Sequence, residues 1–380
     1  MLGYTEHSLI LLLSSTATSP SEAWLTFGRG ALVQWAASGL DSERMREMVG
    51  RRRGSRAVIT AVVLLAAAGC TSDDAEVTGD GEIEGVSVLV TFDIDGAEFP
   101  EGVTVDHEGN VYASLSPLGQ LVRVAAGTEV AQPFGVVEGL EEGDLGLLGL
   151  TVDGDGNVYG AVASANPDAK GVWRFDRETG DADRVAGTEQ IVFANAIIFD
   201  GSTMYVTDTV GPDEQGAVWR VSESGEAEIW AQDARLAGDG SAGFPFPLGP
   251  NGIDVHDGMV YVGLTEPAQI ATIAIEDDGS AGEVLIFADL TTSAVDGGPA
   301  AVDGIGVAAD GSVYVAAPLV HTVFRVSADG AEVATVATAE DGLDGPASLV
   351  LGDGVMYVSN FSAALGASNN NGPGIIRVPL

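Results

Sequence analysis

The sequence predicts an all-β protein, a six-bladed β-propeller. Three observations lead to this fold class: one β-hairpin pattern occurs six times, a third strand follows most of its copies, and glycine is frequent while aromatic residues are few. Of the 380 residues, 52 are glycine and only 6% are aromatic. Such a composition is typical of many short strands joined by tight turns, and a chain with 46% hydrophobic residues has enough apolar surface for a large core.

The repeated hairpin is easiest to see in residues 302–317, VDGIGVAADGSVYVAA. A first strand, a glycine-containing turn and a second strand follow one another there. Each copy carries a tyrosine near the start of its second strand, and successive tyrosines are 43 to 56 residues apart: Tyr112, Tyr159, Tyr205, Tyr261, Tyr314 and Tyr357. A repeat of this length with four strands is typical of a propeller blade. A large β-sandwich would not repeat one hairpin six times.

The two ends of the repeat region predict how the ring closes. The last copy ends at Leu380 after its third strand, whereas the segment VSVLVTF (residues 86–92) precedes the first copy and has no partner. We predict that this segment is the outer strand of the last blade, which closes the ring and removes two exposed sheet edges. The propeller domain therefore spans residues 85–380.

The N-terminal region contains a predicted export signal. The basic segment RRRGSR (residues 51–56) is followed by an apolar run of 12 residues (57–68) and by Gly69-Cys70. This pattern is typical of a secretory signal, and the apolar run is too short for a transmembrane helix. The segment resembles the bacterial lipoprotein signal, in which the cysteine is lipidated, although Ala67 stands where that family prefers leucine. An ordinary cleaved signal with an incidental cysteine is the alternative.

These observations divide the chain into four parts. We expect residues 1–47 to be an upstream extension that is not native, since Met45 and Met48 lie just before the basic segment. Residues 48–69 are the predicted signal peptide, and residues 70–84 form an acidic tether. The mature protein is expected to be extracytoplasmic and anchored to the outer face of the cell membrane through a lipid on Cys70, with no other membrane contact.

The charge balance excludes one class of partner. The chain has 16 basic and 56 acidic residues, a net charge of −40. Nucleic-acid binding requires clusters of Lys and Arg, so nucleic acid is not an expected partner. Such a surface attracts cations instead.

Alignment of the six hairpins on their turns reveals a polar column at the start of the first strand. In a propeller the first strand of each blade lines the central channel, so these six side chains meet at one channel mouth. The position after the column is small in every copy, as the crowded axis requires. The axial column consists of Glu101, Leu148, Asn195, Asn251, Asp303 and Ala347. Turn or cap hydrogen bonds would account for one or two of its polar members, but not for four.

The composition of the axial column predicts a metal site. Two carboxylates that face each other without a partner repel and are costly to desolvate, and a cation removes this conflict. Oxygen ligands without Cys or His disfavour zinc and copper. Calcium is the first choice, with Mg²⁺ or Mn²⁺ as alternatives. The predicted ligands are Glu101, Asn195, Asn251 and Asp303.

Several of these segments resemble a known family. The motifs PEG, NAIIFDGSTMYVTD, PNGI and DGIG are similar to those of the gluconolactonase, regucalcin and senescence-marker-protein family of six-bladed propellers. The paraoxonases have a similar architecture and hold a channel calcium with Glu, Asn, Asn and Asp from successive blades. The resemblance covers the propeller domain and implies a calcium-dependent lactone hydrolase. The second blade contributes Leu148 and no histidine, so the resemblance does not extend to a paraoxonase-type histidine base or to organophosphate chemistry.

Chemistry beside the metal requires groups on the same face of the propeller. The loops between second and third strands return to that face, which makes Asp208 and His321 the candidate catalytic residues. Asp208 is proposed as a general base, with loop capping as the alternative, and His321 faces the substrate or simply packs beside Pro318. The predicted substrate-binding residues are Phe244, Phe246 and Asn360, the last at the start of a candidate lid (residues 360–374).

The sequence therefore predicts a metal-dependent hydrolase whose partner is a small lactone or related ester. The alternative is a non-catalytic lipoprotein that binds a ligand or a protein and uses calcium to tie its blades together. A related lyase is a third interpretation. No motif selects among sugar lactones, acyl lactones and other esters, or specifies an oligomeric state.

Overall fold

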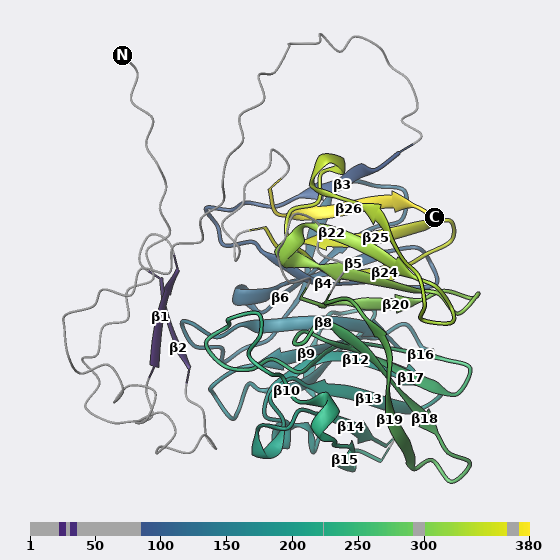
Figure 1. Ribbon diagram of the computed structural model, residues 1–380. Coiled ribbons are helices and arrows are strands. Elements are labelled where there is room, and N and C mark those ends of the chain that lie inside the picture. Colours follow the sequence, from purple (N-terminus) through teal and green to yellow (C-terminus); the bar gives the residue numbers. More distant parts are fainter. Residues whose placement is uncertain (1–22, 28–30, 36–84, 223, 292–300, 363–371) are drawn as a thin grey trace, which may run out of the picture.

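The computed structural model describes residues 23–27, 31–35, 85–222, 224–291, 301–362 and 372–380. Six four-stranded antiparallel sheets between residues 85 and 380 form the blades of a β-propeller (Figure 1). The predicted fold class is confirmed. In every blade the first three strands follow one another along the chain, so each repeated hairpin forms the inner half of one sheet.

The strands of the first three blades follow the chain without interruption. Blade 1 contains β4 (Pro100–Val105), β5 (Val111–Leu115), β6 (Gln120–Val124) and β7 (Ala131–Val136). Blade 2 contains β8 (Gly146–Val152), β9 (Val158–Ala163), β10 (Gly171–Phe175) and β11 (Ala182–Arg184). Blade 3 contains β12 (Ala194–Asp200), β13 (Thr203–Asp208), β14 (Ala217–Val221) and β15 (Ala227–Ala231).

The other three blades complete the ring. Blade 4 contains β16 (Pro250–His256), β17 (Met259–Leu264), β18 (Gln269–Ile275) and β19 (Ala281–Asp289). Blade 5 contains β20 (Ile305–Val307), β21 (Val313–Ala317), β22 (Thr322–Val326) and β23 (Val333–Ala337). Blade 6 contains β24 (Pro346–Leu351), β25 (Val355–Asn360), β26 (Gly374–Pro379) and β3 (Ser87–Thr91).

The repeated tyrosines mark one register position in every blade. Each lies directly opposite a residue of the third strand, and in five blades that residue is arginine. The pairs are Tyr112–Arg123, Tyr159–Arg174, Tyr205–Arg220, Tyr314–Arg325 and Tyr357–Arg377, with Tyr261–Thr272 in blade 4. Cross-strand pairs of this kind help to fix strand register. The tyrosine therefore recurs at one register position in all six blades, with an arginine opposite it in five of them.

The core lies between neighbouring blades. One cluster joins Val218 of β14 and Trp230 of β15 to Val260 and Val262 of β17. The ring of Trp230 also contacts Tyr205 edge-on, with a centroid separation of 4.8 Å. Because each blade buries its faces against its neighbours, closure of the ring matters for the whole domain.

Strand β3 closes the ring as predicted. It pairs antiparallel with β26, the third strand of the last blade, and places Val90 opposite Ile375. Figure 1 shows the two strands side by side. Arg377 of β26 donates to the carbonyl of Val88 and pairs with Glu129 of blade 1, so a side-chain contact also crosses the seam.

The N-terminal predictions lie largely outside the described residues. The strands β1 (Ala23–Phe27) and β2 (Ala31–Trp35) form an antiparallel pair in the predicted upstream extension. The signal peptide, Cys70 and the tether fall in residues 36–84, which the structure does not describe, so they stay predictions. Among the described residues, no helix is long and apolar enough to cross a membrane.

The strand order determines which segments share the face of the axial column. In blade 5 the amide of Asp303 donates to the carbonyl oxygen of Ala316, near the end of β21, so the start of the first strand meets the end of the second. The loop after β21 therefore lies on the same face as Asp303. The turns between first and second strands, such as the one that contains Asp106, lie on the opposite face. We call these the column face and the turn face.

Candidate metal centre

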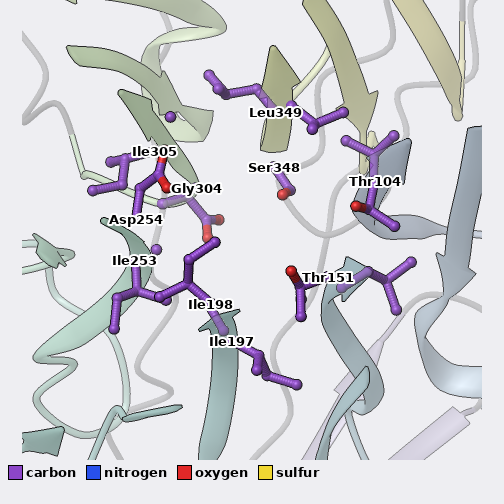
Figure 2. A pocket seen from close by; sticks show the side chains of 18 of the residues that line it. Thr104, Thr151, Ile197, Ile198, Ile253, Asp254, Gly304, Ile305, Ser348 and Leu349 are labelled. Carbon is purple, nitrogen blue, oxygen red and sulfur yellow. The ribbon is translucent and has the colours of Figure 1, made fainter. Parts of the chain in front are cut away.

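The four predicted ligands come together in the central channel. A cavity of about 260 Å³ follows the axis and is lined by Glu101, Asn195, Asn251 and Asp303. Glu101, Asn195 and Asn251 are the second residues of β4, β12 and β16, and Asp303 lies two residues before β20, so each comes from a different blade, as the alignment of the repeats predicts. Figure 2 shows the same cavity with side chains from several innermost strands pointing into it.

The small residues after the axial column allow the blades to approach this closely. A Cβ atom on Gly102 would lie 2.3 Å from the carbonyl oxygen of Leu148, and one on Gly252 would lie 2.5 Å from that of Asp303. Both distances are far below van der Waals contact, so a larger residue would push neighbouring strands apart. The predicted reason for the small column is thus correct for these two positions.

Hydroxyl groups and backbone amides tie the column residues to their neighbours. Ser359 donates to the carbonyl oxygen of Glu101 at 2.5 Å, and Thr207 donates to that of Asn251 at 2.6 Å. The amide of Gly252 donates to the carbonyl oxygen of Asp303 at 3.1 Å. These backbone oxygens are therefore occupied by contacts between blades, which leaves the side chains to face the cavity.

The two carboxylates of the column lack compensation. Glu101 is buried, and its Oε2 atom has no hydrogen-bond partner among the described residues. Burial raises the pKa of Glu101, and the nearby negative charge of Asp303 raises it further. Burial also raises the pKa of Asp303, and a hydrogen bond from Asn251 offsets part of this effect. A cation between the carboxylates would stabilise both in their ionised form.

The two amides of the column are held by threonines. Asn195 donates from Nδ2 to Oγ1 of Thr209 at 3.0 Å, and Asn251 donates from Nδ2 to Oγ1 of Thr265 at 3.1 Å. Both threonines are nearly inaccessible to solvent. Neither threonine was predicted from the sequence, although each follows its asparagine by 14 residues, a spacing that could have revealed it.

This donor set fits a hard cation. Two carboxylates and two amides supply oxygen ligands, which calcium, magnesium and manganese prefer. In the described residues, no group of three or more His, Cys, Asp and Glu side chains could hold a metal ion, so the column depends on its amide oxygens. Leu148 and Ala347 supply no polar side chain, which leaves room for water or a substrate.

Further along the channel, another carboxylate has a structural role. Asp254 of β16 accepts hydrogen bonds from the amide of Val307 at 2.6 Å and from that of Val255 at 2.8 Å. Figure 2 shows Asp254 on one side of the cavity and Thr104 on the other. Since Val307 belongs to β20, Asp254 anchors the strand that follows Asp303.

Asp208 lies on the column face but is not exposed. Its Oδ1 atom accepts hydrogen bonds from the amides of Phe193 and Gly211, and its Oδ2 atom accepts from the amide of Val192 and from Nε1 of Trp219. The side chain has 0% exposure and is not part of the cavity lining. Burial raises its pKa, while these hydrogen bonds act against the increase. These contacts match the alternative interpretation of Asp208 as a residue that caps its loop.

His321 also lies on the column face and outside the lining of the axial cavity, and its ring is paired. Its Nδ1 atom accepts a hydrogen bond from the amide of Gly345 at 2.9 Å and lies 3.5 Å from Oδ1 of Asp344. Asp344 is buried; Ser362 donates to its Oδ2 atom, while Oδ1 has no hydrogen-bond partner among the described residues. Burial raises the pKa of Asp344, and Ser362 and His321 oppose this. The sequence analysis did not single out Asp344.

Asn360 stabilises a neighbouring loop through hydrogen bonds. It is fully buried, accepts from the amide of Asp344 at 3.0 Å and donates to the carbonyl oxygen of Gly342 at 2.9 Å. Both polar ends of its amide are therefore used within the protein. Most of the candidate lid, residues 363–371, lies outside the described residues.

Aromatic pairs line the rim of the column face. Phe246 packs against Phe193 with a centroid separation of 6.4 Å, and both belong to the cluster that contains Leu148 of the axial column. Phe244 is partly buried in the same loop. The analysis of the sequence missed a second pair, Phe99 and Phe361, whose centroids are 6.1 Å apart. The first pair thus packs with Leu148, an apolar member of the axial column.

Comparisons with known proteins agree with this architecture. Residues 87–124 match the family described as "Strictosidine synthase-like, N-terminal". A search of curated proteins found no match to this sequence. Among solved structures, a gluconolactonase from Xanthomonas campestris is similar with a TM-score of 0.55 and 16% identity, over 78% of this chain and 90% of that one.

Two further structures show what the fold can accommodate. The calcium-binding protein regucalcin from Agrobacterium tumefaciens matches with a TM-score of 0.54 and 16% identity, over 74% of this chain and 90% of that one. A PQQ-bound aldose sugar dehydrogenase from Streptomyces coelicolor matches with a TM-score of 0.53 and 18% identity, over 78% and 98% of the two chains. At these identities the likeness shows the fold, and function has to be argued from the site.

Proposed function

We propose that this protein is a calcium-dependent hydrolase of a lactone or a related ester. The observation that carries the proposal is the pair Glu101 and Asp303, two buried or partly buried carboxylates that face one cavity, one of them with an oxygen that has no partner among the described residues. Asn195 and Asn251 complete the set of oxygen ligands. When bound, calcium supplies a Lewis acid for a carbonyl oxygen and lowers the pKa of water.

The rim favours one kind of substrate. Phe193 and Phe246 contact the cluster of Leu148, and Phe99 and Phe361 form a second apolar pair. Phe193 is buried, whereas Phe246, Phe99 and Phe361 are partly exposed and would offer apolar surface to a substituent, whose burial there gains free energy. We therefore propose a lactone or ester with an apolar substituent rather than a polyhydroxylated sugar lactone.

We assign contact with the substrate to His321 and not to Asp208. The four hydrogen bonds to Asp208 and its complete burial leave no access for water or substrate. The His321 side chain is 21% exposed, and its Nδ1 atom accepts a hydrogen bond from the amide of Gly345, so the neutral ring carries its proton on Nε2. That N–H group can donate a hydrogen bond to a substrate oxygen and stabilise the negative charge that develops on it.

A second candidate function is calcium binding without catalysis. It is favoured by the contacts that tie the backbone of the column residues to neighbouring blades, such as Ser359 to Glu101 and Thr207 to Asn251. A calcium ion at this position would link four blades through their first strands. We also retain, from the sequence, the proposal that the protein is extracytoplasmic and lipid-anchored at Cys70.

A hydrolysis assay with and without a chelator distinguishes the two functions. We expect hydrolysis of lactones with apolar chains, its loss with EDTA, and its recovery with added calcium. The His321→Gln variant should keep calcium affinity and lose most of the activity. Calcium binding without hydrolysis of any tested lactone or ester would favour the structural role, and absence of calcium binding in calorimetry would reject both functions.

A further inference from the structure

The orientation of the two asparagine amides is determined by their surroundings. An amide can present either its oxygen or its NH₂ group to the cavity, and only the oxygen binds a cation. In both asparagines the Nδ2 atom contacts a threonine hydroxyl, at 3.0 Å for Thr209 and 3.1 Å for Thr265. The neighbours of these hydroxyls show why the reverse orientation is unfavourable.

At Asn195 the constraint comes from the proton of the threonine. Thr209 donates its hydroxyl proton to the carbonyl oxygen of Pro250 at 2.7 Å. That proton is not available to Asn195, so the hydroxyl offers only its lone pairs to the amide. A flipped amide would place its oxygen against the hydroxyl oxygen, and two acceptors would face each other in a buried site. The oxygen of Asn195 is therefore directed away from Thr209.

At Asn251 the same contact recurs. Its Nδ2 atom donates to Oγ1 of Thr265 at 3.1 Å, and Thr265 is the counterpart of Thr209 in the next blade. The matching geometry in two blades indicates that the threonine hydroxyl receives the NH₂ group of the amide and leaves the amide oxygen for a ligand.

We propose that Thr209 and Thr265 are positioning residues that hold the amide oxygens of Asn195 and Asn251 toward the channel mouth and so make it a cation site. This inference rests on the proposed calcium site. It explains how two neutral amides can act as calcium ligands beside two carboxylates. The same function is not needed in blade 1, where the column residue is Glu101 and either carboxylate oxygen can bind.

Blade 1 supplies a matched control. Ser116 occupies the corresponding position, directly after the second strand, and is equally buried. Its hydroxyl donates to the carbonyl oxygen of Leu145, and no column residue among the described residues donates to it. Ser116→Ala therefore removes a buried hydroxyl of similar structural value without changing the orientation of a predicted ligand.

Calcium titration calorimetry of these variants tests the inference. We expect Thr209→Val and Thr265→Val each to weaken calcium binding about tenfold, Thr209→Ser to restore it, and Ser116→Ala to change it less than twofold. In an Asn195→Ala background, Thr209→Val should cause no further loss of affinity, because the threonine acts through the asparagine. Thermal unfolding of the calcium-free proteins measures the structural cost of each change separately.

Three outcomes decide the matter. Wild-type protein that binds no calcium rejects the metal site itself, and the inference with it. Wild-type protein that binds calcium with unchanged affinity in the valine variants rejects only the positioning role. A loss that persists in the Asn195→Ala background would show that Thr209 acts through blade packing. If Thr209→Val fails to fold, Thr265→Val with the Asn251→Ala background gives the same test.

Discussion

Two pairs of buried or partly buried acidic side chains on the column face have different surroundings. Asp208 accepts four hydrogen bonds, and Glu266 accepts three, from the amides of Gly240, Ala242 and Leu248. Glu101 and Asp303 face the axial cavity instead, and Oε2 of Glu101 has no partner among the described residues.

The comparison shows that burial alone does not identify a functional carboxylate. Asp208 and Glu266, the outer pair, stabilise the fold. Each carboxylate holds a loop by accepting hydrogen bonds from backbone amides that would otherwise lack a partner. Glu101 and Asp303, the axial pair, carry negative charge that the fold does not neutralise, and a bound cation can neutralise it. The number of protein hydrogen bonds, and not exposure, separates the two pairs.

The largest effect on stability is expected for Asp208→Ala. The substitution leaves three backbone amides and the Trp219 indole without an acceptor, and each buried unsatisfied group costs about 1–3 kcal/mol. We expect the free energy of unfolding to fall by about 4 kcal/mol or more in urea titrations. Calcium affinity of the folded fraction should stay within twofold. A large loss of affinity with little change in stability would place Asp208 in the metal site.

Asp303→Ala should weaken calcium binding strongly and leave the fold intact, the opposite of Asp208→Ala. Calcium affinity depends on the charge and number of ligands, so calorimetry should show a loss of at least about 100-fold, or about 2.7 kcal/mol. The calcium-free variant should stay folded by circular dichroism, because Glu101 no longer faces a second charge. Asp106→Ala, in a turn of the turn face, is the control and should leave binding unchanged. Normal calcium binding by Asp303→Ala would contradict the proposed centre.

The pH dependence of stability should separate the pairs further. The pKa values of Glu101 and Asp303 are raised in the folded protein, so unfolding releases protons at neutral pH. Without calcium, the stability contribution of these groups is therefore greatest at low pH and is lost as the pH rises above about 4, by about 1–2 kcal/mol. Thermal unfolding at pH 4.5 and 7.5 measures this difference. Saturating calcium should remove most of it, and the Asp303→Asn change should reduce it, because burial still raises the pKa of Glu101 in that variant. An unchanged slope in both cases would show that the axial pair is not the cause.

The smallest effect is expected for Glu266→Gln. The amide retains one acceptor oxygen but places an NH₂ group against one of the three backbone amides, which costs about 1 kcal/mol. Chemical denaturation should detect this loss, while calcium affinity and its pH dependence should match the wild type. A change in calcium affinity would mean that the outer and axial pairs are coupled through the loop of residues 240–248.

The repeated part of the structure could be predicted from the sequence because its causes are local. A glycine turn, a tyrosine in the second strand and an arginine in the third recur at one register position, and strand alternation follows from neighbouring residues. Alignment of the repeats also identified Glu101 and Asn195 as neighbours, since equivalent positions of a symmetric ring must meet at its axis. The closing strand β3 followed from counting strands.

The contacts between blades could not be predicted from the sequence, because they depend on the tertiary structure. Asn360 resembled a rim residue in the sequence, yet the loop around Asp344 surrounds its amide completely. The ring of His321 is set by the amide of Gly345, and the amide of Asn195 by a hydroxyl whose proton is held by Pro250 of the next blade. Such hydrogen bonds depend on how loops from separate repeats meet in space. The sequence alone therefore determined which residues surround the axis, and only the packing of the blades decided which of their atoms remain free to bind.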